Sequence, residues 1–291
     1  MNYEFIAHII ISASIFYIIS AWFKFFLKLK GNLDISYLAI VIFGAYAWAI
    51  LNKAFGFWIV TVVLLAFLGS LVFTILVLYL SNRLDEVYFT LWTFALYILV
   101  FQLALNMDGI TGWALWLTWM TQNIIWAISI QNITWFLIFA LIIVFIVILA
   151  LWYFKSSFFY KTLQWWWEKA LVVKSLGVKI KRYKLIMILI TTFLAVLWGN
   201  LFGFYYLYID PSSFWLSMLI NVLLISFLSY KFDDLRTFGI ALLVLFFYEY
   251  LRFFKIVDPS KVGYFREIVF AIFIMISAFI VFRKTSFSRE N

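Results

Sequence analysis

The sequence predicts an all-α integral membrane protein, a polytopic bundle of about eight to ten transmembrane helices. Hydrophobic residues make up 67% of the chain and charged residues only 12%. The mean hydropathy is +1.09, whereas a soluble domain is nearer half apolar and a quarter charged. Only 2 prolines interrupt the 291 residues. Helices with apolar side chains on every face require lipid as their solvent.

Nine apolar runs are long enough to be considered as membrane spans, because crossing the hydrocarbon core takes roughly 20 helical residues. They lie at about 5–27, 35–51, 57–80, 87–105, 133–153, 185–208, 214–230, 237–254 and 266–283. If all nine cross, successive loops alternate between the two sides of the membrane.

The basic residues predict which side is cytoplasmic. With alternating spans, 17 of the 22 Lys and Arg residues fall on one side. Residues 155–184 alone carry eight of them, against the single acid Glu168. Cytoplasmic loops are enriched in Lys and Arg, so we expect a multi-pass protein of the cell membrane with its N-terminus outside and its C-terminus in the cytoplasm.

The stretch 113–132 differs from the nine runs. Trp113, Trp116, Trp119 and Trp126 recur at helical spacing among Thr, Gln and Asn side chains. Amphipathic aromatic segments favour the membrane–water interface. We therefore predict a helix that lies on the outer surface, with a tenth span as the alternative.

Composition and motifs exclude several classes of chemistry. The chain has no cysteine and one histidine, His8, which excludes disulfides, thiolate catalysis and multi-histidine metal sites. No Gly-x-x-x-x-Gly-Lys-Ser/Thr loop is present, so the chain does not hold a nucleotide in that way. We predict no enzyme activity, no cofactor and no metal. The net charge of +9 indicates cytoplasmic loops and anionic lipid, and we expect no nucleic-acid partner.

Small residues recur every four positions at Ala195, Gly199 and Gly203. Such a stripe lets two helix backbones approach closely in lipid. The stripe predicts intramolecular packing, with the lining of a translocation path as the alternative that the neighbouring Asn200 keeps open.

Several short motifs follow one another in an order that resembles a known family. Gly31–Ser36 is followed by Phe43–Tyr46, then Arg83–Thr90, Leu105–Gly112, Lys174–Leu185 and Ile209–Phe214. Together they resemble the permease subunits of the leucine/isoleucine/valine ABC importers, and most closely the LivM type. The resemblance covers about residues 30–285.

The resemblance implies a single permease domain over residues 1–291 that imports branched-chain or related hydrophobic amino acids. The implied partners are a second permease subunit, ATP-binding cassette subunits that hydrolyse the ATP, and an extracytoplasmic substrate-binding protein. Two alternatives remain. The chain is a urea or short-amide permease of the same fold, or it is a non-transporting membrane scaffold or assembly protein, since Ser36 and Ile42 replace family glycines.

Two sets of site residues follow. Residues 155–184 suit an amphipathic helix and a break at Gly177, which is either an interfacial helix or, as the resemblance implies, the segment that couples the permease to the ATPase. The coupling residues would be Glu168, Ala170, Leu171, Lys174 and Gly177. The translocation path would include Asn32, Asp34, Gly44, Tyr46 and Asn200, with Asp34 at its cytoplasmic mouth because a carboxylate is costly at a helix centre.

Overall fold

The computed structural model describes residues 3–30, 34–106, 123–125, 128–129, 132–168, 173, 175–214, 216–251 and 262–287. Each of the nine apolar runs coincides with a helix. These helices are α1 (Tyr3–Lys30), α2 (Ser36–Phe55), α3 (Ile59–Ser81), α4 (Glu86–Asn106), α7 (Ile133–Ser156), α10 (Ile180–Tyr206), α11 (Leu216–Leu228), α12 (Asp234–Tyr250) and α13 (Val262–Phe287). The predicted all-α fold class is confirmed.

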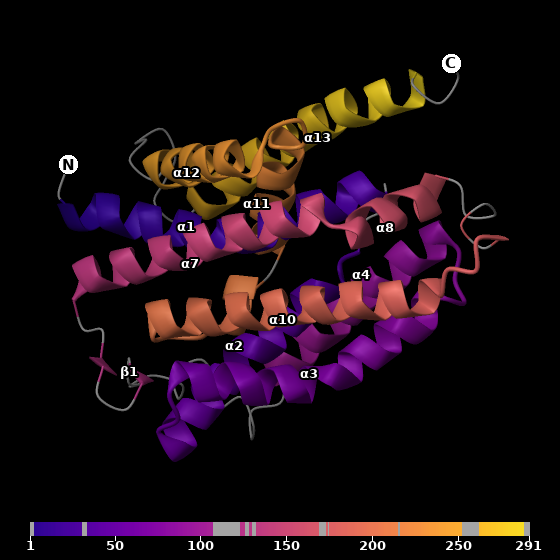
Figure 1. Cartoon of the computed structure of the whole chain (residues 1–291). Helices are drawn as coiled ribbons and strands as arrows, with labels where there is room; N and C mark the ends of the chain where they lie inside the picture. Colours follow the sequence, from indigo (N-terminus) through magenta and orange to yellow (C-terminus); the bar gives the residue numbers. More distant parts are fainter. Residues whose placement is uncertain are drawn as a thin grey trace.

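Helix α1 runs through the middle of the bundle and joins two groups of helices (Figure 1). It contacts α7, α10, α11 and α12. Helices α2, α3, α4 and α10 pack together on one side of it, and α11, α12 and α13 on the other (Figure 1). A short helix, α8 (Phe158–Glu168), follows α7 and contacts both α1 and α10. Most side chains of α1 are buried from Ala7 to Leu27, as its central place requires.

The outer helices expose large apolar side chains. Val72 on α3 is 71% exposed and Phe145 on α7 is 61% exposed. Such surfaces are unfavourable in water and suited to lipid tails. Seven of the described helices are long and apolar enough to span a membrane: α1, α2, α3, α4, α7, α10 and the segment of η1 and α11. The chain is therefore a multi-pass membrane protein.

A tight turn connects α2 and α3. Gly56 has φ +64° and its N–H donates to the Asn52 carbonyl at 2.8 Å, which ends α2 in a left-handed conformation. The Asn52 side-chain amide donates to the Phe57 carbonyl at 3.0 Å. Glycine adopts this conformation at little cost, so a few residues suffice to reverse the chain between two spans.

The predicted interfacial helix at 113–132 is wrong in the part that the structure describes. Asn123–Ile125 and Ile128–Ser129 form two short antiparallel strands, β1 and β2. The isoleucines favour extended backbone, and the helical spacing of tryptophans lies mainly before them. Residues 113–122 lie outside the described residues, and the placement of the segment along the outer surface stays a prediction.

Candidate functional site

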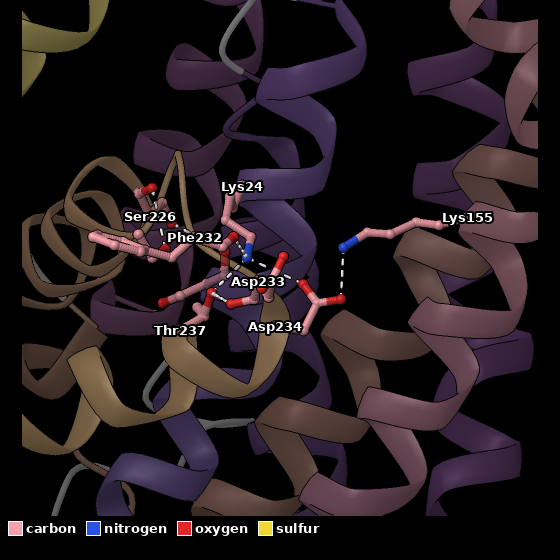
Figure 2. A network of polar contacts seen from close by, with 9 residues as sticks. Lys24, Lys155, Ser226, Phe232, Asp233, Asp234 and Thr237 are labelled. Atoms are coloured by element: carbon pink, nitrogen blue, oxygen red, sulfur yellow. Dashed lines mark hydrogen bonds and ion pairs between the residues drawn. The ribbon is translucent and has the colours of Figure 1, made fainter.

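A buried cluster of charges joins α1, α7 and α12 (Figure 2), close to where α1 and α7 end and α12 begins. The Lys24 side chain on α1 is 0% exposed, and its ammonium donates to Asp234 Oδ1 at 3.1 Å and to Thr237 Oγ1 at 2.5 Å. The Lys24 ammonium also donates to the Phe232 carbonyl at 3.2 Å. Lys155, at the end of α7, donates to the other carboxylate oxygen of Asp234 at 2.6 Å.

The geometry satisfies every donor of the buried ammonium, since a lysine has three N–H groups and Lys24 meets three acceptors. Burial alone would raise the pKa of Asp234. The hydrogen bond from Lys155 and the positive charges of Lys24 and Lys155 outweigh burial, so the pKa of Asp234 is lowered. The carboxylate therefore stays ionised and ties three helices together.

Helix α8 packs beside this charge cluster. The ring of Phe159 stacks on Tyr183 of α10 at a centroid distance of 4.9 Å, and Tyr160 lies 5.2 Å from Phe25 of α1. Leu163 is fully buried, whereas Trp165 on the same helix is 63% exposed. One face of α8 is thus fixed to the bundle and the other is free for a partner or the membrane surface.

Helices α2 and α10 approach each other closely along the stripe of small residues. A Cβ atom at Gly199 would lie 2.3 Å from the Val41 carbonyl oxygen and 2.8 Å from the Ala45 nitrogen. At Gly203 it would lie 2.5 Å from Trp48. The stripe therefore brings backbone against backbone, which confirms the close packing that the spacing predicted.

Several buried polar atoms on α2 and α10 have no described hydrogen-bond partner. The Asn200 amide nitrogen donates to the Val196 carbonyl at 2.8 Å, but its oxygen has no hydrogen-bond partner among the described residues. The Tyr46 hydroxyl and the Trp198 ring nitrogen are also buried without a described partner. Unpaired buried polar groups cost roughly 1–3 kcal/mol each.

A cavity of about 310 Å³ lies at the opposite end of α12 from Asp234. Its walls come from α1, α10, α11, α12 and the short 3₁₀ helix η1 (Pro211–Phe214). Ser12, Asn221 and Glu249 are the polar side chains of the wall that come from α1, α11 and α12. Among the described residues, no three His, Asp or Glu side chains form a group that would hold a metal ion.

Comparison with known protein families identifies the family of this chain. The family described as the permease component of branched-chain amino acid transport systems matches residues 5–278. The chain belongs to this permease family. Comparison with curated proteins and with solved structures gave no match.

Only two of the five predicted coupling residues of the permease, Glu168 and Gly177, lie within the described structure. Glu168 is the last residue of α8, while Ala170, Leu171 and Lys174 lie outside the described residues. Gly177 has φ +72°, so the left-handed break predicted at this position is confirmed. Glycine adopts such a backbone at little cost, so this residue suits the turn that precedes α10.

The structure brings together only some of the predicted path residues. Gly44 faces Asn200, whose amide nitrogen would lie 3.5 Å from a Cβ atom at Gly44. Asp34 precedes α2 and accepts hydrogen bonds from the Ser36 backbone N–H at 3.0 Å and the Ser36 hydroxyl at 2.6 Å. Eight helical residues, about 12 Å, separate Ser36 from Gly44. Asn32 lies outside the described residues.

Sequence reasoning missed two groups of residues in the permease. Asp234 looks like an exposed loop acid beside Asp233, yet it is 8% exposed and pairs with Lys24, 210 positions away. The cavity residues Ser12, Asn221 and Glu249 come from three separate helices. The sequence does show that the cavity residues are polar residues inside apolar runs. It does not show which of these runs are neighbours in the fold.

Proposed function

We propose that this permease is the membrane-spanning subunit of an ABC importer for branched-chain or related hydrophobic amino acids. The family match over residues 5–278 carries the proposal. ATP would be hydrolysed on a separate cassette subunit. A second permease and an extracytoplasmic binding protein would complete the complex.

For the orientation, we propose that the end of the bundle with Lys24, Lys155 and α8 faces the cytoplasm. The support is the concentration of Lys and Arg in residues 155–184. The N-terminus and the α2–α3 turn would then face outside.

Single-cysteine labelling tests this orientation, because the chain has no cysteine of its own. Lys53, in the last turn of α2, and Ser175, which precedes α10, are both exposed and are predicted to face opposite sides. In intact cells, a membrane-impermeant maleimide should label Lys53→Cys, and it should label Ser175→Cys only after permeabilisation. The reverse pattern would refute both the orientation and the coupling assignment.

For the coupling segment, we propose that residues 155–184 dock onto the ATPase. The support is that α8 buries Leu163, packs the partly buried Phe159 against the bundle and leaves Trp165 exposed. A docking element must be fixed to the spans that it moves and open toward its partner. At Gly177 a Cβ atom would meet no other atom within 4 Å, so the turn before α10 has space around it.

Gly177→Val should uncouple transport from ATP hydrolysis without unfolding the membrane domain. A β-branched residue resists the left-handed conformation, and the strain is about 1–3 kcal/mol. We expect normal membrane insertion and at least a fivefold loss of leucine-stimulated ATPase activity in the purified complex.

Gly56→Val is the matched control for Gly177→Val. Gly56 has φ +64°, and a Cβ atom there would also meet nothing within 4 Å, but this glycine lies in the α2–α3 turn. The same local strain there should leave ATPase stimulation intact. Equal losses in both variants, or full stimulation in Gly177→Val, would contradict the docking role.

For the translocation path, we propose the region beside the α2–α10 contact, where Tyr46 and Asn200 hold buried polar atoms without described partners. Asp34 would lie at its cytoplasmic mouth, with Gly44 and Asn32 along it. A scaffold without transport is the competing function, and the tight α2–α10 packing at Gly199 favours it. Purification from native membranes separates the two, since only the importer should retain an ATPase subunit.

A further inference from the structure

The cavity between α1, α10, η1, α11 and α12 has a wall of aromatic rings. Phe16, Phe202, Tyr206, Tyr208 and Tyr248 all line it. Its volume of about 310 Å³ is at the lower end of the range for small-ligand pockets, roughly 300–1,000 Å³. The lining residues lie in the first half of α1 and in the last turns of α10 and α12. In the proposed orientation, the cavity therefore lies in the outer half of the bundle.

Two hydrogen-bond acceptors in the wall have no partner in the described structure. Asn221 on α11 is 6% exposed, and its side-chain oxygen is buried without a hydrogen bond. Glu249 on α12 lines the same cavity and makes no hydrogen bond or ion pair with the described residues. A buried amide oxygen without a donor is unfavourable, and the partly exposed carboxylate in the same wall attracts positive charge. Both are therefore suited to a ligand that brings donors.

The charge of the cavity wall indicates that the hydrogen-bond donor of the ligand is positively charged. Glu249 is the one formally charged residue among the described residues that line the cavity. Aromatic faces also attract cations, through their ring quadrupoles. The remaining wall at Ile9, Met218 and Leu245 is apolar. A small ligand that satisfies all of these has a primary ammonium group on a short apolar body.

We propose that this cavity is an amino-acid binding site, in which Glu249 and Asn221 accept hydrogen bonds from the ammonium group and the aromatic and apolar wall holds the aliphatic side chain. The inference rests on the proposed import of hydrophobic amino acids and names the place where the substrate is first held. The Ser213 hydroxyl lines the cavity and supplies a donor for a carboxylate, while the Ser12 hydroxyl is hydrogen-bonded to the Tyr206 hydroxyl at 3.1 Å.

The backbone and a neighbouring cation keep the aromatic wall in place. Leu207 has φ +52°, a conformation that costs about 1–2 kcal/mol outside glycine. It stands between Tyr206 and Tyr208, and both of these line the cavity. On the other side, the Arg266 guanidinium lies 4.2 Å from the centre of the Tyr248 ring, which fixes that ring by a cation–π contact.

Calorimetric titration of the purified complex with three probes tests the site. The probes are L-leucine, L-leucinol, which keeps the ammonium but lacks the carboxylate, and 4-methylpentanoate, which lacks the ammonium. Leucine and leucinol should bind and 4-methylpentanoate should not. Glu249→Gln should weaken binding of leucinol about ten- to a hundredfold, the effect of losing a hydrogen bond to a charged group. Asn221→Leu should weaken it by about tenfold or more, because the amide oxygen accepts a hydrogen bond from the same charged ammonium group.

Glu267→Gln is the matched control, because Glu267 is a partly buried acid on α13 that does not line the cavity. Its affinity for leucinol should equal that of the unaltered protein. Unchanged binding in Glu249→Gln, equal binding of leucinol and 4-methylpentanoate, or no binding of any probe would overturn the site. A thermal unfolding curve like that of the unaltered protein should accompany each variant.

A phosphatidylethanolamine headgroup carries the same ammonium chemistry, and the lipid composition distinguishes the two sources. Leucinol should bind equally in nanodiscs with and without phosphatidylethanolamine. Loss of binding when this lipid is present would assign the cavity to the headgroup and overturn the amino-acid site. Leucinol binding without ATP-driven leucine uptake would contradict the importer and leave the site standing. Leucine uptake with an unchanged KM in Glu249→Gln would support the importer and contradict the binding site.

Discussion

Replacing Gly199 by alanine is expected to lower the apparent unfolding temperature of the purified permease by roughly 2–12 °C. The added Cβ atom would lie 2.3 Å from the Val41 carbonyl oxygen and 2.8 Å from the Ala45 nitrogen. Both are backbone atoms that move only with helix α2. Forcing extra atoms into a packed core typically costs about 1–3 kcal/mol, and each kcal/mol shifts the midpoint by about 2–4 °C in a large domain.

Alanine substitutions at two further glycines should have smaller effects on stability and serve as comparisons. Gly203→Ala should cost less, because its Cβ would meet the side chains of Trp48 at 2.5 Å and Ile209 at 2.9 Å, which can shift. Gly239→Ala on α12 has nothing within 4 Å and should be neutral or stabilising by up to about 1 kcal/mol from helix propensity. The same unfolding temperature for all three variants would contradict the packing.

Asp234→Asn is expected to destabilise the permease by about 3–5 kcal/mol, the range for breaking a buried ion pair. The change leaves the fully buried ammonium of Lys24 without its counter-ion and removes the partner of Lys155. Asp233→Asn is the control, since that side chain is exposed and forms no cap hydrogen bond. It should change stability by less than about 0.5 kcal/mol.

A second substitution distinguishes loss of the pair from general damage. Lys24→Met combined with Asp234→Asn removes both buried charges and should recover much of the loss. Detergent-solubilised yield and unfolding temperature measure the cycle. A double variant that is no better than Asp234→Asn alone, or equal losses for Asp233→Asn and Asp234→Asn, would show that the pair is not what joins α1 to α12.

The pKa of Asp234 also sets a pH window for this stability. Because its pKa is lowered in the folded protein, the stabilisation is fully present above the ordinary aspartate value of about 3.9. It is lost only as pH falls toward the lowered folded value. The cluster should therefore contribute equally at about pH 5 and about pH 8.

The sequence was sufficient for the helices because hydropathy over about 20 residues measures directly what a span requires. The local features at Gly177 and at the Gly199 stripe were likewise predictable, since a helix end and a helix face depend on neighbouring residues. Tryptophan spacing was misleading here, because Asn123–Ile125 and Ile128–Ser129 form two short antiparallel strands instead of a helix.

The charge cluster and the cavity were beyond local reasoning. Lys24 and Asp234 are 210 positions apart, and hydropathy treats each as a loop charge. Asn221 and Glu249 become a candidate site only when α11 and α12 place them on one cavity with α1. Which polar residue is buried, and against what, depends on helix neighbours that no window along the chain reports.

Uptake of radiolabelled leucine by cells of the source strain, with and without the gene, tests the importer most directly. Deletion should abolish a component of leucine uptake that isoleucine and valine compete for, and the gene on a plasmid should restore it. That component should resist an uncoupler at constant ATP and disappear when arsenate depletes ATP. Unchanged uptake after deletion, or uptake that the uncoupler abolishes while ATP is maintained, would contradict ATP-driven import by this permease.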